Sequence, residues 1–263
     1  MADLLQITHE SHGILRLTLN DPARRNALSE TMLDYLWDAI QLASNDVGVR
    51  AIIIAANGPA FCAGHDLKEL TAGRDSDDKG KAYFTKIMTR CSSVMQSILQ
   101  TPKPVIAEVT ATATAAGCQL VASCDLAYAS SSAKFSTPGV HIGLFCSTPM
   151  VALSRNVGGK HAMEMLLTGD LISADEAAQK GLINKSLSGE ELEEYLLEKA
   201  KKISSKSSTT LKIGKKAFYR QIEMPLDQAY EYASQVMVEN MMDQDAKEGI
   251  EAFLEKRNPN WKK

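Results

Sequence analysis

The sequence of 263 residues has no long apolar run and no excess of basic charge. Its longest uninterrupted apolar stretch, residues 51–56, is far shorter than the roughly 18 residues that a membrane-spanning helix needs. We therefore expect no membrane span. Lys and Arg number 29 against 32 Asp and Glu, and the formal net charge is -3. This balance argues against nucleic acid as the main partner.

Cysteine is also sparse, and its pattern excludes two kinds of small cross-linked fold. The five cysteines are an odd number and include no CxxC pair, so neither a disulfide framework nor a zinc knuckle is indicated. We expect no metal site. The first residues lack the basic and apolar blocks of a signal peptide, and Asp3 and Glu10 are unusual in a transit peptide. We expect a cytoplasmic protein, with the mitochondrial matrix as the alternative if a leader has been removed.

The first half of the chain alternates between strand and helix patterns. Residues 50–56 contain Ile52, Ile53 and Ile54 in a row, which is typical of a strand buried on both faces. Ser29, which precedes this strand in the sequence, is a good N-cap for a helix between the two. The predicted strands are residues 13–20, 50–56, 105–109 and 125–129. One predicted helix begins after Ser29, another ends at Gln100, and another covers residues 115–123. This order predicts an α/β fold with a mainly parallel sheet.

The chain becomes almost wholly helical after Ser147. Two capping boxes, which begin at Ser173 and Ser188, mark helix starts. We divide the chain into a core, residues 1–204, and a helical region, residues 205–263, within one continuous domain. The helical region is predicted to pack against the body or a partner subunit and to cover the active site, because it is rich in methionine and aromatic residues: Phe218, Tyr219, Tyr230, Tyr232, Met237, Met241 and Met242.

Two segments place small residues where a strand is predicted to turn into a helix. These are residues 59–70 (PAFCAGHDLKEL) and residues 111–120 (ATATAAGCQL). Backbone N–H groups at a helix start have no intrahelical partner and can bind an oxygen that gains negative charge. Small side chains let a ligand come close. Each segment alone is also what a tight strand-to-helix turn requires.

Other short motifs accompany these two segments along nearly the whole chain. They are residues 23–28 (ARRNAL), 61–66 (FCAGHD), 104–107 (PVIA), 116–120 (AGCQL), 124–127 (CDLA), 133–139 (AKFSTPG), 167–169, 174–183, 248–250 and 256–257. Together these stretches resemble the crotonase superfamily, which is the enoyl-CoA hydratase/isomerase family. Within the family, residues 113–119 and 143–149 look like the enoyl-CoA hydratase domain-containing protein 3 branch.

The resemblance implies a spiral of ββα repeats followed by C-terminal helices, assembled as a homotrimer or a hexamer. It implies an acyl-CoA thioester as substrate, with coenzyme A as part of the substrate and no other cofactor, and a place in fatty acid metabolism. The family's oxyanion hole falls on the backbone N–H groups of His65 and Ala116. Its coenzyme A contacts fall on Arg25, Ala63 and Asp66.

The sequence departs from the family where the hydratases have two catalytic glutamates. The aligned positions are Gln119 and Gly139, and neither side chain can carry a proton. General acid–base catalysis contributes about 100- to 10,000-fold per group. We therefore expect hydratase/isomerase chemistry in name, with weak hydration. The alternatives are a non-catalytic acyl-CoA binder or regulator, and an acyl-CoA thioester hydrolase.

Four other residues are candidates for the missing chemistry. His65 and His141 can titrate near neutral pH, although each is also a common type of structural histidine. Glu108 interrupts an apolar strand, where an unpaired carboxylate is costly, so it could face the pocket or an interface. Cys146 falls on the loop that borders the acyl pocket in the family. It could attack a thioester with His141 as base, or it could be a buried, inert thiol.

Overall fold

The computed structural model describes residues 3–261, and its elements alternate as the sequence predicts. In chain order they are β1 (Leu5–His9), η1 (Ser11–Gly13), β2 (Ile14–Leu19), η2 (Pro22–Arg24), α1 (Glu30–Asn45), β3 (Ala51–Ala56), β4 (Ala60–Cys62), α2 (Leu67–Gly73), α3 (Lys81–Gln100), β5 (Val105–Val109), β6 (Thr112–Thr114), α4 (Ala116–Ser123), β7 (Leu126–Ser130), β8 (Lys134–Ser136), η3 (Pro138–Ile142), α5 (Pro149–Asn156), α6 (Gly159–Thr168), β9 (Ile172–Ser173), α7 (Ala174–Gln179), β10 (Lys185–Leu187), α8 (Gly189–Ser204), α9 (Ser208–Gln221), α10 (Leu226–Met241) and α11 (Gln244–Leu254).

Local sequence signals set several of these boundaries. The Ser29 side chain accepts a hydrogen bond from the Met32 N–H at the start of α1. Both predicted capping boxes are formed, at Ser173 for α7 and at Ser188 for α8. These side chains satisfy N–H groups that have no partner inside the helix, which is why the helices begin there.

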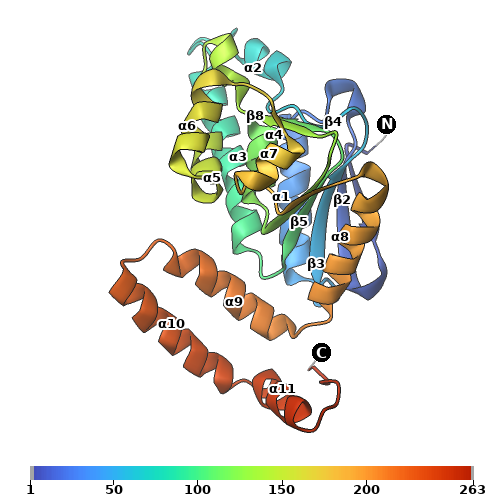
Figure 1. The fold of residues 1–263 in the computed structure, drawn as a ribbon. Helices are drawn as coiled ribbons and strands as arrows, with labels where there is room; N and C mark the ends of the chain where they lie inside the picture. The colour runs from blue at the N-terminus through green and yellow to red at the C-terminus, as the bar shows by residue number, and fades with distance from the viewer. Residues whose placement is uncertain (1–2, 262–263) are drawn as a thin grey trace.

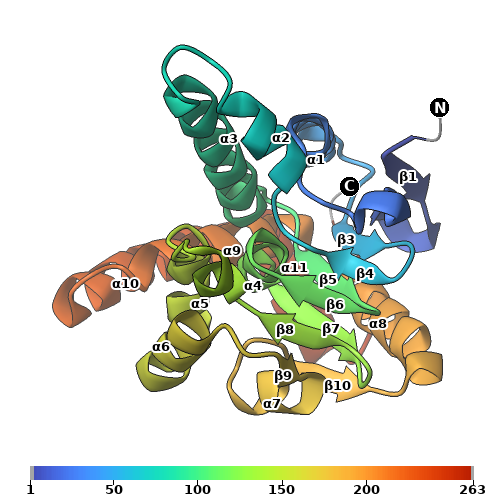
Figure 2. The same ribbon diagram turned by 90° about the horizontal axis from the view of Figure 1, so that it is seen from above.

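Two sheets form the centre of the molecule. The larger has the strand order β1-β2-β3-β5-β7-β10, and the smaller has the order β4-β6-β8-β9. All neighbours are parallel except the pairs β1–β2 and β8–β9. The pairs β3–β4, β5–β6 and β7–β8 each send their first strand to the larger sheet and their second to the smaller one (Figure 2). The expected spiral of ββα repeats is confirmed.

The sequence patterns missed the short strands. They contain no prediction of β1, and they treat β4 and β6 as parts of strand-to-helix turns. They also omit β8, β9 and β10. Most of these strands have two or three residues, too few to show a period, and their pairing partners are distant in sequence. The small sheet therefore exists only through contacts made in three dimensions.

Helices cover both faces of the larger sheet (Figure 1). On one face, α1, α3 and α4 build the main core together with side chains such as Leu36, Ile54 and Val94. On the other face, α8 packs with Leu192 and Leu196 over Ile53 and Ile106. No helix in the described part of the chain is long and apolar enough to span a bilayer.

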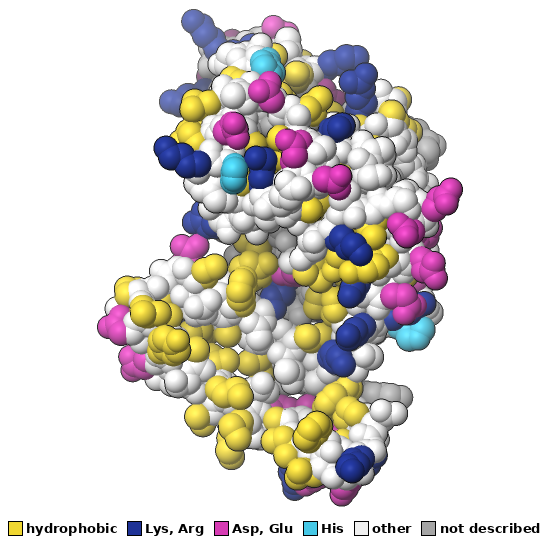
Figure 3. Space-filling model, viewed as in Figure 1, with side chains coloured by type: hydrophobic (Ala, Val, Ile, Leu, Met, Phe, Trp, Pro, Cys, Tyr) yellow, Lys and Arg dark blue, Asp and Glu magenta, His cyan; other side chains and the backbone are white. Residues whose placement is uncertain are grey.

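The last three helices, α9 to α11, form a C-terminal arm (residues 208–254) that extends away from the body (Figure 1). Hydrophobic side chains are prominent on its surface (Figure 3). They are Phe218, Ile222, Leu226, Tyr230, Met237, Val238, Met241, Met242, Ile250, Phe253 and Leu254, all more than half exposed. Helix α8 ends at Ser204, just before the arm, and the division of the chain at residue 204 stays a prediction.

A buried ion pair fastens α9 to the body. The Lys215 Nζ donates to Asp125 Oδ2 at 2.6 Å and to the carbonyl oxygens of Ile98 and Lys103 at 2.8 and 2.9 Å. The Tyr219 hydroxyl donates to Asp125 Oδ1 at 2.8 Å. Because α9 is anchored in this way, the apolar surface of α10 and α11 is held in a defined position outside the core.

Candidate active site

The first side of the site is the turn between β4 and α2. Gly64 has φ of +95°, a conformation that favours glycine, and its carbonyl oxygen accepts a hydrogen bond from the Leu28 N–H at 2.7 Å. Asp66 then caps α2, because its Oδ1 accepts hydrogen bonds from the N–H groups of Lys68 and Glu69. The N–H of His65 lies between the flipped glycine and the cap.

The second side is the turn between β6 and α4. Ala115 has φ of +50° and ψ of -119°, which costs an alanine about 1 to 3 kcal/mol. Its N–H donates to the Ser136 carbonyl oxygen at 3.0 Å, which holds the strained residue in place. Ala116 is the first residue of α4, so its N–H has no partner inside the helix.

The two turns lie against each other. A Cβ placed on Gly64 would be 2.9 Å from the Ala115 Cβ and 3.3 Å from the Ala116 N. The preceding strands β4 and β6 are paired in parallel, and the Thr114 hydroxyl donates to the Ala63 carbonyl oxygen at 3.1 Å. In the described part of the chain, no turn, loop or cap hydrogen bond uses the N–H of His65 or of Ala116. Two free donors therefore lie side by side, each after a residue with positive φ.

The turns open into a cavity of about 330 Å³, called here the inner pocket. It is lined by Ala63, His65, Leu67, Leu70, Met88, Ala115 and Ala116, and by residues 138–149 apart from Val140 and Gly143. No Lys, Arg, Asp or Glu is part of this lining. The inner pocket is therefore an apolar chamber that is bordered by two backbone donors.

A second hollow of about 290 Å³, called here the outer groove, adjoins the inner pocket. The two share Ala63, His65 and Leu67. The outer groove also contains Arg25, Asp66 and Lys68. The structure thus brings together Arg25, Ala63 and Asp66, the three positions at which the resemblance implies coenzyme A contacts.

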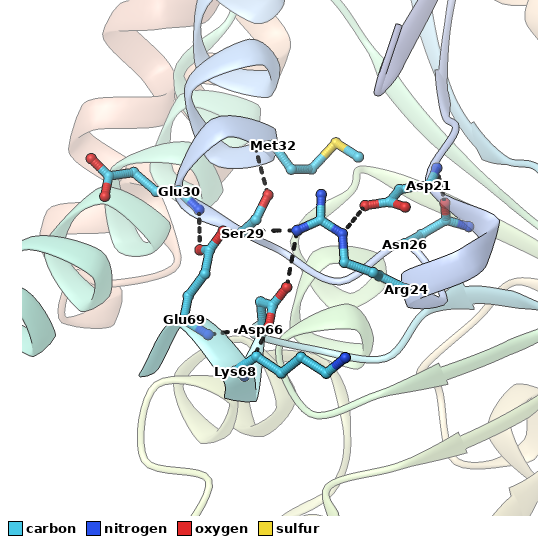
Figure 4. A network of polar contacts seen from close by, with 9 residues as sticks. All are labelled: Asp21, Arg24, Asn26, Ser29, Glu30, Met32, Asp66, Lys68 and Glu69. Carbon is cyan, nitrogen blue, oxygen red and sulfur yellow. Dashed lines mark hydrogen bonds and ion pairs between the residues drawn. The ribbon is translucent and has the colours of Figure 1, made fainter. Parts of the chain in front are cut away.

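A polar network that the sequence analysis missed supports the outer groove (Figure 4). The Arg24 guanidinium lies between Asp21 and Asp66, with N–O distances of 2.6 and 3.2 Å, and Glu69 is 3.9 Å away. The Glu69 carboxylate in turn accepts a hydrogen bond from the Glu30 N–H at 2.9 Å. Arg24 is therefore neutralised by carboxylates and ties η2 to α2. The three-residue spacing between Asp21 and Arg24 was the one local sign of this network in the sequence.

Arg25 and Lys68 differ from Arg24 in having no carboxylate partner. Neither makes an ion pair with the residues that the structure describes. They are the two cations of the outer groove that remain available to an anionic ligand.

The positions aligned with the missing glutamates differ in their surroundings. Gln119 lies on α4, is 5% exposed, and its Oε1 accepts no hydrogen bond from the described residues. It is not part of the inner-pocket lining. Gly139 does line the pocket, and a Cβ there would be 2.7 Å from the Leu144 carbonyl oxygen and 2.9 Å from the Cys146 Sγ. A backbone oxygen and a sulfur atom therefore occupy the space that a side chain at position 139 would need.

The remaining candidates within the pocket do not form a nucleophile–base pair. Cys146 lines the pocket but is 7% exposed, and burial raises the pKa of its thiol although the Gly139 backbone N–H partly opposes the shift. His141 is exposed on the pocket rim, and no hydrogen bond joins it to Cys146 in the described part of the chain. The geometry gives the thiol no base.

The His65 imidazole is mostly buried beside the first donor. Burial lowers its pKa, and a backbone contact with Leu28 partly opposes the shift. Neither ring nitrogen makes a well-formed hydrogen bond within the described residues. At neutral pH the ring is therefore uncharged.

Glu108, like Gln119, is a predicted site residue that the structure places outside the lining of the inner pocket. It is paired in register with Tyr128 on the face of the sheet that α8 covers, and it does not line the inner pocket. Its carboxylate forms an ion pair with Arg16, which also contacts Glu10. Burial raises the pKa of Glu108, and Arg16 opposes the shift. The hypothesis of a catalytic Glu108 is therefore corrected: an apolar strand carries this carboxylate because Arg16 on β2 neutralises it.

The described residues contain no cluster of three or more His, Cys, Asp or Glu side chains that could hold a metal ion. The lining of the inner pocket includes the two residues with free backbone donors, the His65 imidazole and the Cys146 thiol.

Comparisons with known proteins show the family and the fold that this chain resembles. The profile of a family described as "Enoyl-CoA hydratase/isomerase" matches residues 9–263. Enoyl-CoA hydratase domain-containing protein 3, mitochondrial, from Mus musculus is 50% identical over 98% of this chain and 84% of its own length. The crystal structure of the human protein of that name superimposes with a TM-score of 0.93, at 45% identity over 98% of this chain and 100% of the other. An enoyl-CoA hydratase structure from Mycobacterium smegmatis gives 0.94, at 48% identity over 98% and 99%.

Proposed function

The chain belongs to the enoyl-CoA hydratase/isomerase family, and we propose that it binds an acyl-CoA thioester and stabilises negative charge on the thioester oxygen. One observation carries the proposal: Gly64 and Ala115, both with positive φ, present the adjacent free N–H groups of His65 and Ala116 to one apolar pocket. Strain of this kind on an alanine persists where the surrounding structure requires it, commonly at functional sites.

The donors act on the oxygen of the thioester carbonyl. When charge moves onto that oxygen, two preorganised N–H groups stabilise it, and each is worth about 3 to 4 kcal/mol in comparable sites. Ala116 begins α4, so the positive end of that helix acts on the same oxygen. The acyl group then occupies the inner pocket, while the phosphates of coenzyme A lie in the outer groove near Arg25 and Lys68.

Hydration is expected to be weak. The Gln119 amide is buried outside the lining of the inner pocket, and neither this amide nor Gly139 can remove or deliver a proton. The filled space at position 139 favours a second candidate, an acyl-CoA binder or regulator without turnover. The hydrolase alternative has less support, because the Cys146 thiol is buried and has no base.

Calorimetric titration with acetyl-CoA and acetoacetyl-CoA tests the binding proposal, with free coenzyme A as the reference ligand. We expect both thioesters to bind more tightly than coenzyme A. The absence of heat and of competition at millimolar thioester would contradict the proposal.

We also propose that the protein assembles as a homotrimer or a pair of trimers. The C-terminal arm carries a long apolar surface, and a surface of this kind on a soluble monomer is a liability. Light scattering at micromolar concentration should report at least three chains. A particle of 28.6 kDa, the mass of one chain, would contradict it.

The names of the vertebrate relatives bear on location. They describe mitochondrial proteins, which does not support the expected cytoplasmic location and favours the mitochondrial matrix. We therefore propose the mitochondrial matrix. Fractionation of cells that express the natural gene checks this, and recovery in the cytosolic fraction alone would contradict it.

A further inference from the structure

The part of the inner-pocket lining that residues 138–149 form has an unusual construction around Gly139. The Leu144 N–H donates to the Gly139 carbonyl oxygen at 2.9 Å and folds residues 139–144 into a closed turn. The turn returns the chain so that the Leu144 carbonyl oxygen and the Cys146 Sγ lie within 3 Å of where a Cβ at position 139 would be. The thiol therefore replaces a side chain of residue 139 as the surface that a ligand meets.

The protonation state of the Cys146 thiol determines which contacts it can make with a ligand. Burial raises the pKa of Cys146, so the protonated form dominates at neutral pH. A protonated, buried cysteine behaves as a small apolar side chain with a weak donor. Cys146 is also part of the main hydrophobic core, so packing fixes its position.

The rest of the lining excludes charge from the acyl group. The ionisable side chains on the pocket surface are those of His65, His141 and Cys146. The His65 ring is held neutral by burial, and His141 lies at the exposed rim. A carboxylate at the end of an acyl chain would thus lose its water without gaining a cationic partner, which is costly.

We propose that the site selects thioesters of apolar, uncharged acyl groups, and that Cys146 is the specificity-determining residue that limits the length of acyl chain admitted. This inference rests on the proposed function. A volume of about 330 Å³ is at the lower end of the range for small-molecule pockets, so the chain is short to medium in length.

The test is a titration of the unmodified protein with straight-chain saturated acyl-CoA thioesters from acetyl to dodecanoyl. Each methylene that enters the pocket should tighten Kd about fourfold, and the gain should stop at a definite length. Adipoyl-CoA, which ends in a carboxylate, should bind at least about 100-fold more weakly than hexanoyl-CoA, which has the same number of acyl carbons.

Two variants then test Cys146 itself. Cys146→Ala removes the sulfur and should move the stopping point to a chain at least one carbon longer. Cys146→Ser is closer in size to cysteine than alanine is but adds a polar hydroxyl, so it should weaken binding of the longer chains and move the stopping point less than Cys146→Ala does. Cys124→Ala is the matched control, because Cys124 is also 7% exposed but lies at the hollow between α9 and the body.

The outcomes distinguish a failure of this inference from a failure of the proposed function. Three results would each overturn the inference while acyl-CoA binding stands. They are equal affinity for adipoyl-CoA and hexanoyl-CoA, affinities that do not depend on chain length, and a stopping point that is the same in Cys146→Ala and wild type. Failure of every thioester to bind, acetyl-CoA included, would overturn the proposed function and this inference with it.

Discussion

The two sides of the inner pocket are built from different parts of the chain. On one side, the donors are backbone N–H groups that Gly64 and Ala115 aim by their own conformation. On the other side, acid–base chemistry would need a side chain at position 139, which glycine lacks, and Gln119 is buried outside the pocket lining. A backbone donor survives a change of side chain as long as the turn survives, whereas proton transfer is lost with one substitution. Binding and charge stabilisation can therefore persist in a pocket whose acid and base are gone.

The largest effect that this contrast predicts is on hydration. We expect wild-type protein to hydrate crotonyl-CoA at least about 1,000-fold more slowly than a relative with both glutamates, because each missing acid–base group is worth about 100- to 10,000-fold. Loss of the enoyl absorbance with purified protein measures the rate. A rate comparable to that of ordinary hydratases would show that another acid and base operate, and His65 and His141 would be the first positions to mutate.

The second prediction concerns a variant that displaces the two backbone donors. Gly64→Ala places a Cβ 2.9 Å from that of Ala115 on a residue with φ of +95°, so the turn must move and the donors must separate. We expect binding of acetoacetyl-CoA to weaken about 10-fold, in line with the loss of one hydrogen bond to a neutral carbonyl oxygen. Calorimetry measures this, with the melting temperature recorded to show that the variant is folded.

The control for that variant is Gly214→Ala on α9, where an added Cβ meets no atom within 4 Å. It should leave binding unchanged and raise stability by up to about 1 kcal/mol. If Gly64→Ala bound acetoacetyl-CoA as tightly as Gly214→Ala does, the assigned donors would be wrong.

The third prediction concerns repair of the side-chain side. Gln119→Glu with Gly139→Glu should increase crotonyl-CoA hydration by less than about 10-fold, because a side chain at position 139 collides with a backbone oxygen and the Cys146 Sγ. Gln119→Glu alone keeps the size of the side chain but buries an ionisable carboxyl group, so it should unfold at a lower temperature than wild type. Thermal unfolding and the same absorbance assay check both variants. A double variant with the activity of an ordinary hydratase would show that the loop of residues 144–146 yields readily.

The smallest effect concerns His65, which contributes its N–H to one side of the pocket and its ring to the buried wall. Burial lowers the pKa of the folded-state imidazole, so below about pH 6.5 the unfolded chain binds more protons than the folded one. The stability due to the neutral ring is therefore fully present above about pH 6.5 and is lost as the pH falls through this value towards the folded pKa.

This loss has an upper limit of about 1.4 kcal/mol per pH unit for a single group. Denaturant unfolding of wild type and His65→Asn at pH 7.5 and pH 5.5 measures it by difference, since the other titrating groups are common to both proteins. An identical pH dependence in the two proteins would mean that the ring is not shielded from water.

Much of the fold could be predicted from local patterns. The isoleucine run predicts β3, Ser29 predicts the start of α1, and two capping boxes predict α7 and α8. These signals work because side chains a few residues apart fix them. The two- and three-residue strands of the smaller sheet have no such signal, since their stability comes from partners about 20 or more residues away.

The candidate site divides in the same way. The small residues around Gly64 and Ala115 and the lack of glutamates at positions 119 and 139 can be read along the chain. The fate of Glu108 cannot, because a carboxylate in an apolar strand could meet a substrate or an ion partner, and its partner Arg16 is on another strand, 92 positions away.

What the sequence by itself determined is the order of buried strands and capped helices, the two turns of small residues, and the residue types that are missing. Only the tertiary structure decided that the turns meet, that Cys146 fills the space beside Gly139, that Arg24 is neutralised while Arg25 is not, and that the arm projects from the body. The reason is one of range: helix caps and strand periods depend on neighbours along the chain, whereas a pocket depends on distances between segments that only the packed core fixes.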